Sequence, residues 1–180
     1  MADQTFGPCR SRATTKPRQS REDPVFYLCK SCGRVLYGMG DSDSCGEARI
    51  QCCGRPMEQL RQQDKRVLPP ECELDYKIVG GFNNNAVKVS WSPADPAFQP
   101  KWIFLKNYTG GQLKFIPKEK RSPAVFPLAD EDAYAYCDED PCLECVFCCK
   151  FGFSFFVYFE QFGLITLPVD RKRANWQSAS

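Results

Sequence analysis

The chain has 180 residues with a net charge of +2, and its 43% apolar content is enough for a hydrophobic core. So small a net charge argues against a general binder of nucleic acid or of anionic membranes, which would carry a clear basic excess. Twelve cysteines and no histidine are the unusual part of the composition. Because no apolar signal sequence opens the chain, these cysteines indicate thiolate metal sites in a reducing, cytoplasmic environment rather than a disulfide framework.

The first segment, residues 1–24, is polar and basic, and offers little to bury. Its charges stand among serine, threonine and proline: Arg10, Arg12, Lys16, Arg18 and Arg21. We therefore expect a disordered basic tail. An organelle transit peptide would need an apolar helical face, which this segment lacks.

Residues 25–60 form a cysteine module, which opens with the strand-like residues 25–28. Cys29 and Cys32 make a C-x-x-C pair, and the adjacent Cys52 and Cys53 follow about twenty positions later. A C-x-x-C pair on a tight turn presents two sulfurs to one ion, and a second close pair completes a tetrahedron. Zinc and rubredoxin-type iron both accept four thiolates, so the spacing predicts the site but not the metal. Cys45 lies outside both close pairs and is expected to be a bystander.

The polar residues 61–70 end in two prolines and are expected to be a linker. From there to residue 140 the pattern is β throughout, with short alternating segments separated by glycine, proline and asparagine. This pattern predicts a small antiparallel β-sandwich. Strands are expected at residues 76–79, 86–91, 101–106 and 112–116, and interior aromatic rings at Trp91, Trp102, Phe104 and Phe126.

Residues 141–180 form a cysteine- and phenylalanine-rich extension. Its first part holds four closely spaced cysteines: Cys142, Cys145, Cys148 and Cys149. These thiols could bind a soft metal, or they could be buried as small apolar side chains, and the sequence favours neither. Residues 151–159 and 162–169 are apolar, but charges interrupt them and each is too short to span a membrane. We expect two buried strands or a partner-binding surface there.

The cysteine module, with Gly54, Pro56 and Met57 after its second pair, resembles the N-terminal iron domain of the desulforedoxin and desulfoferrodoxin family, in which four cysteines hold one iron. The region after the linker resembles the C-terminal part of desulfoferrodoxin, an immunoglobulin-like sandwich that acts as a superoxide reductase. The second resemblance rests on residues 86–89, 95–96, 102–105, 111–117, 124–130 and 133–137. It implies an all-β chain, with a small rubredoxin- or desulforedoxin-like metal knot followed by an immunoglobulin-like antiparallel sandwich.

The resemblance breaks at the catalytic iron, which the family holds with four histidines and one cysteine. The family's Glu-Lys-His segment reads Glu73, Leu74 and Asp75 here, and its His-Pro reads Asp95 and Pro96. Its terminal Tyr-Cys-Asn-Leu-His motif reads Tyr136, Cys137 and, at the histidine, Asp140, while the remaining histidine falls at Phe98 or Gln99. The resemblance thus implies a second site of Asp75, Asp95, Cys137 and Asp140, with Glu73 and Cys137 in catalytic roles.

A second placement sets residues 158–164 against the same terminal motif. It puts Phe159 at the cysteine and Phe162 at the histidine, and keeps the motif's final Gly163 and Leu164. The distance from Phe126 favours the placement at Cys137.

Two functions are compatible with this reading. The first is a non-haem iron redox protein of the superoxide reductase type, with an electron-transfer tetrathiolate iron and a degenerate catalytic centre. This function implies an electron donor such as a rubredoxin-type or flavin reductase. It also implies superoxide as the substrate if the centre is active. The second is a structural or partner-binding protein that zinc or iron stabilises, without catalysis. A second iron has no firm support, because carboxylates are harder ligands than imidazoles. The sequence leaves a homodimer open.

Overall fold

The computed structural model describes residues 22–40, 49–79, 85–93, 95, 98–136 and 150–169. These residues form an all-β chain, as the sequence predicts, with short 3-10 turns at η1 (Lys65–Val67) and η3 (Asp130–Ala133). Within the described ranges, no helix is long and apolar enough to cross a membrane. The basic tail, Cys45 and the four clustered cysteines after residue 141 lie outside the described residues.

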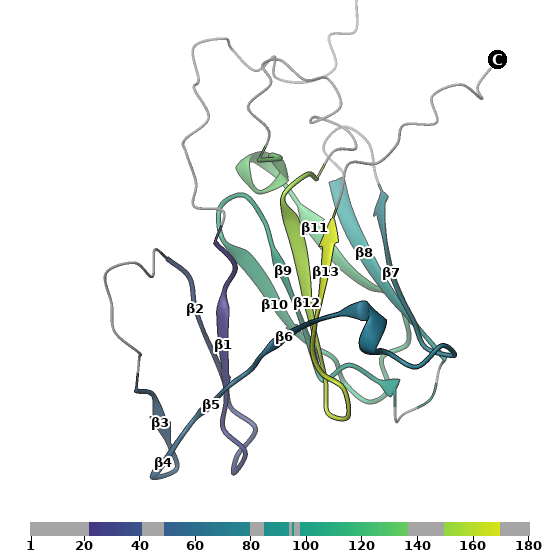
Figure 1. Cartoon of the computed structure of the whole chain (residues 1–180). Coiled ribbons are helices and arrows are strands. Elements are labelled where there is room, and N and C mark those ends of the chain that lie inside the picture. The colour runs from purple at the N-terminus through teal and green to yellow at the C-terminus, as the bar shows by residue number, and fades with distance from the viewer. Residues whose placement is uncertain are drawn as a thin grey trace, which may run out of the picture.

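The cysteine module is a small sheet beside a two-stranded ribbon (Figure 1). β1 (Val25–Leu28) pairs antiparallel with β2 (Val35–Gly38) on one side and with β5 (Glu58–Gln59) on the other. β3 (Gln51–Cys52) and β4 (Arg55–Pro56) form the ribbon. The C-x-x-C turn joins β1 to β2, and the second cysteine pair lies where β3 turns into β4, so both pairs are held at strand ends.

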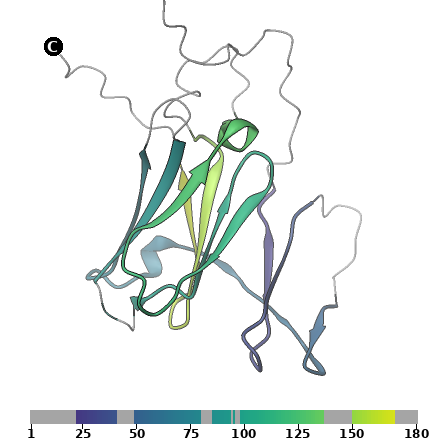
Figure 2. The same cartoon turned by 180° about the vertical axis from the view of Figure 1, so that it is seen from behind.

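The rest of the chain is a sandwich of two sheets, seen from both sides in Figures 1 and 2. One sheet has the order β10-β9-β12-β13-β6, and the other has the order β11-β8-β7. Neighbouring strands are antiparallel, except that β13 and β6 are parallel. The strands are β6 (Gln62–Asp64), β7 (Glu73–Val79), β8 (Asn85–Ser92), β9 (Trp102–Lys106), β10 (Gly111–Phe115), β11 (Ala124–Leu128), β12 (Phe153–Phe159) and β13 (Gly163–Val169).

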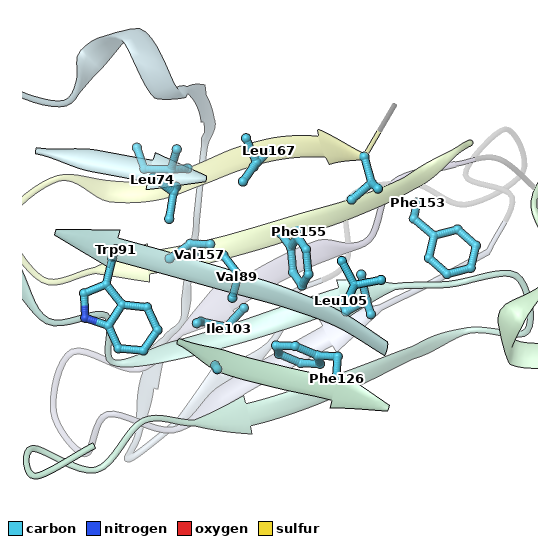
Figure 3. Close-up of a cluster of buried hydrophobic side chains, with 14 of the residues drawn as sticks. Leu74, Val89, Trp91, Ile103, Leu105, Phe126, Phe153, Phe155, Val157 and Leu167 are labelled. Atoms are coloured by element: carbon cyan, nitrogen blue, oxygen red, sulfur yellow. The ribbon is translucent and has the colours of Figure 1, made fainter. Parts of the chain in front are cut away.

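Alternate residues of these strands fill the space between the sheets (Figure 3). On β11, Ala124, Phe126 and Leu128 are buried while their neighbours are exposed, which is the period of two that a half-buried strand requires. Trp91 and Phe126 belong to this inter-sheet core. Burial of the four predicted aromatic rings is confirmed, but Trp102 and Phe104 belong to a different cluster.

That second cluster lies between the cysteine module and the outer face of the larger sheet. Phe26 of β1 is completely buried against Trp102 and Phe104 of β9 and Phe156 of β12. Every residue of β9 is buried, because the second sheet covers one of its faces and the module covers the other. The module is therefore packed onto the sandwich rather than tethered beside it.

The sheets do not end where the sequence analysis placed the domain boundaries. β12 and β13, from the extension beyond residue 140, lie inside the larger sheet, where β12 pairs with both β9 and β13. The expected linker supplies β6, which pairs with β13 at the sheet edge. Of the two options for the extension, the structure shows the buried strands, and the reason is that β12 is covered on both faces.

Candidate metal centre

Four cysteine sulfurs converge at the end of the module, from Cys29, Cys32, Cys52 and Cys53, and they all lie within 4.8 Å of one another. The Sγ atom of Cys52 is 3.6 Å from that of Cys32 and 3.9 Å from that of Cys53. Four sulfurs at about 2.3 Å from one tetrahedral ion would be about 3.8 Å apart. The arrangement therefore fits a tetrathiolate metal site, which the spacing of the cysteines predicts.

The backbone turns on both sides explain how four sulfurs meet. In the first turn, the Cys29 N–H donates to the Arg34 carbonyl at 2.9 Å and the Gly33 N–H donates to the Cys29 carbonyl at 2.8 Å. In the second turn, Cys53 has a φ of 52° and Gly54 a φ of 70°. Adjacent residues of an extended strand point to opposite faces, so the left-handed backbone at Cys53 is what lets its sulfur reach the same point as that of Cys52.

The site is buried on one side and open on the other. Cys29 and Cys52 are 3% and 7% exposed and pack with Met57, against which Tyr27 and Ile50 also lie. Cys32 and Cys53 are exposed. Beside the site, a surface cleft of about 420 Å³ is lined by Leu28, Cys29, Lys30, Ser31, Arg55, Pro56, Met57 and Glu58. An ion bound here would be reached from solvent through the second and fourth cysteines.

The four thiols influence one another's ionisation. The backbone N–H of Cys32 lowers the pKa of Cys29 to about 6, because it stabilises the thiolate. Hydrogen bonding with the Cys32 side chain is the largest cause of the raised pKa of Cys52. It is also the largest cause at Cys53, whose pKa is raised to about 12. Ionisation of one thiol therefore raises the pKa of its neighbours. A bound cation would lower those pKa values again, so that the thiols lose their protons to solvent on metal binding.

Two of the four residues expected at a second metal site, Asp75 and Asp95, lie in the part of the structure that is described. Glu73, Asp75 and Asp95 are exposed, and Asp75 lies on the outward face of β7. Within the described ranges, no group of three or more metal-binding side chains includes any of them. Leu74, where the resemblance places the family's lysine, is buried in the inter-sheet core. Cys137 and Asp140 lie outside the described residues.

Comparison with known proteins supports the fold. No family model and no curated protein matches this chain. Among solved structures, the superoxide reductase from Treponema pallidum matches with a TM-score of 0.52 over 81% of this chain and 97% of that chain, at 17% sequence identity. The chain has a superoxide reductase-like fold.

Within this superoxide reductase-like fold, the second placement of the family's terminal motif falls on the turn between β12 and β13. Phe159 ends β12 and Phe162 lies in that turn, and both contact Phe98. Phe98 and Gln99 are the two residues at which the resemblance places another histidine ligand. The ring centroids are 5.0 Å apart for Phe98 and Phe159, 5.5 Å for Phe98 and Phe162, and 6.0 Å for Phe159 and Phe162. Phe98, Phe159 and Phe162 are thus mutually packed phenyl rings, which have no atom that could coordinate a metal.

The sequence carried a signal for this aromatic group. The spacing that keeps Gly163 and Leu164 of the motif also places Phe159 and Phe162 at the ligands. Nothing in the sequence alone would have brought Phe98, some sixty residues earlier in the chain, to the same point.

Proposed function

We propose that this chain is a non-haem iron redox protein that holds one iron at the four-cysteine site and transfers single electrons there. The observation that carries the proposal is the convergence of four sulfurs within 4.8 Å. Iron bound by four thiolates would alternate between its ferric and ferrous forms. Cys29 and Cys52 would hold it against the apolar interior of the module, and the exposed Cys32 and Cys53 would form the face at which a partner passes electrons.

We further propose that the superoxide-reducing centre is degenerate. Superoxide is an anion, and electrostatic attraction needs a positive charge near the reaction centre. The family's lysine is replaced by the buried Leu74, while Asp75 and Asp95 add negative charge to the exposed surface. In the second placement of the terminal motif, the packed rings of Phe98, Phe159 and Phe162 support the same conclusion, since aromatic carbon cannot replace imidazole or thiolate as a ligand.

The second candidate is a metal-stabilised structural or partner-binding protein without catalysis. It is supported by the small interior of the module, where Cys29 and Cys52 are themselves buried core residues. So small a core gains stability from a bound ion, and zinc accepts the same four sulfurs. For the first function we propose a rubredoxin-type or flavin reductase as the electron donor, and for either function a cytoplasmic location.

Metal analysis of anaerobically purified protein distinguishes the two functions. We expect one equivalent of iron with the visible absorption of a ferric tetrathiolate, whereas zinc is silent in the visible. One equivalent of zinc in protein expressed with ample iron would favour the second candidate.

Stopped-flow mixing of the reduced protein with superoxide then tests the degenerate centre. We expect oxidation far slower than that of a histidine-bearing superoxide reductase. Near diffusion-limited oxidation, or a second equivalent of iron that disappears in Cys137→Ser, would contradict this part of the proposal.

A further inference from the structure

Arg34 makes a contact with the metal site that the cysteine spacing does not predict. Its Nη1 atom donates to the Sγ atom of Cys52 at 3.7 Å. The main chain of Arg34 is also fixed relative to the site, because its carbonyl accepts the Cys29 N–H at 2.9 Å. The guanidinium is therefore held beside the sulfur of Cys52, a residue that is 7% exposed.

Two other cations near the site are placed differently. The ammonium of Lys30 is 2.7 Å from the Glu58 carboxylate, so its charge is balanced locally. Arg55 lies opposite Cys52 in the β3–β4 ribbon and is exposed. Arg55 thus resembles Arg34 in charge and exposure, but of these two arginines only Arg34 donates a hydrogen bond to a site sulfur.

The charge of the site explains what such a contact would do. Four thiolates with a trivalent ion carry a single net negative charge, and with a divalent ion they carry a double one. A guanidinium that donates a hydrogen bond to one sulfur stabilises the doubly negative form more, because its attraction grows with the charge it faces. Hydrogen bonds to the sulfurs are a recognised influence on the potentials of thiolate-bound iron.

We propose that Arg34 tunes the tetrathiolate centre by stabilising its doubly negative form, and so raises the midpoint potential of the iron. The inference rests on the proposed iron site, although the electrostatic argument applies equally to divalent zinc. Arg34 acts through Cys52 and is a positioning residue rather than a ligand. Because it is exposed, its effect should shrink as salt concentration rises.

The test is a redox titration of the iron-loaded full-length protein, followed by its visible absorption. An exposed ion pair changes an equilibrium up to about fivefold. In Arg34→Gln we expect the ferrous-to-ferric ratio at a fixed potential to fall by about that factor, which is about 40 mV for a one-electron couple. Arg34→Lys should recover most of the shift, and Arg55→Gln, with the same loss of charge, should show a much smaller one.

Equal shifts in Arg34→Gln and Arg55→Gln would overturn the inference, because the contact with sulfur would then not matter. An unchanged potential in Arg34→Gln would also overturn it. If the wild-type protein shows no ferric tetrathiolate absorption, the proposed function has failed instead. Arg34 is then tested in zinc-loaded protein by competition with a chelator: faster zinc loss from Arg34→Gln than from Arg55→Gln supports the inference, and equal rates overturn it.

Discussion

Replacing Phe26 by alanine should separate the cysteine module from the sandwich. Phe26 is completely buried, and its ring centroid lies 5.1 Å from that of Trp102, 5.3 Å from that of Phe104 and 5.4 Å from that of Phe156. The change therefore removes the module's central contact with both β9 and β12.

The expected loss follows from the buried area. A fully buried phenylalanine removes about 200 Å² from water, which is worth about 5 kcal/mol at 25 cal/mol per Å². Alanine retains part of that burial, so Phe26→Ala should lower the free energy of unfolding by about 4 kcal/mol, within the range for buried phenylalanines. With a urea m-value of about 2 kcal/mol per M, the midpoint falls by about 2 M.

Urea unfolding is followed by near-ultraviolet circular dichroism, to which Trp102 contributes because it packs directly on Phe26. Phe115→Ala is the matched control, since Phe115 is 64% exposed on β10 and its loss should change the free energy of unfolding by less than about 0.5 kcal/mol. Equal midpoints for the two variants would refute the conclusion that Phe26 fastens the module to the sheet.

Cys52→Ser should abolish metal binding and the tetrathiolate absorption, whereas Cys72→Ser, at a half-buried thiol outside the four-sulfur group, should keep both. Metal retained in Cys52→Ser would contradict the assignment of the four-cysteine site. Gly152→Ala should lower the free energy of unfolding in urea by about 2 kcal/mol or more, because Gly152 has a φ of +88° and a Cβ there would lie 2.5 Å from the Tyr136 ring. Gly38→Ala is the control and should lower it far less, because a Cβ at Gly38 would meet no atom within 4 Å. Burial raises the pKa of the Tyr158 hydroxyl, so the folded state favours the neutral phenol; this contribution is present below about pH 10 and is lost as pH rises through the folded pKa. Tyr158→Phe should therefore lose less stability between pH 9 and pH 11 than the wild type, and an equal loss would count against the shift.

The features that short stretches of sequence encode could be predicted. The spacing of the C-x-x-C pair and of the adjacent cysteine pair predicted the four-sulfur group that the structure contains. Alternation within single strands likewise predicted an all-β chain and the burial of Trp91 and Phe126, because the side-chain period of a strand is a property of its own backbone.

The arrangement of layers depended on contacts between distant parts of the chain. Alternation predicts that Trp102 and Phe104 lie on a covered face, but it does not say that the cysteine module covers it, because that requires Phe26 from another sheet. Contacts between distant parts of the chain also determine three other features: the central place of β12 in its sheet, the packing of Phe98 on Phe159 and Phe162, and the contact of Arg34 with Cys52. Each joins residues whose separation in the chain carries no local signal, so the packing of the sheets brings them together.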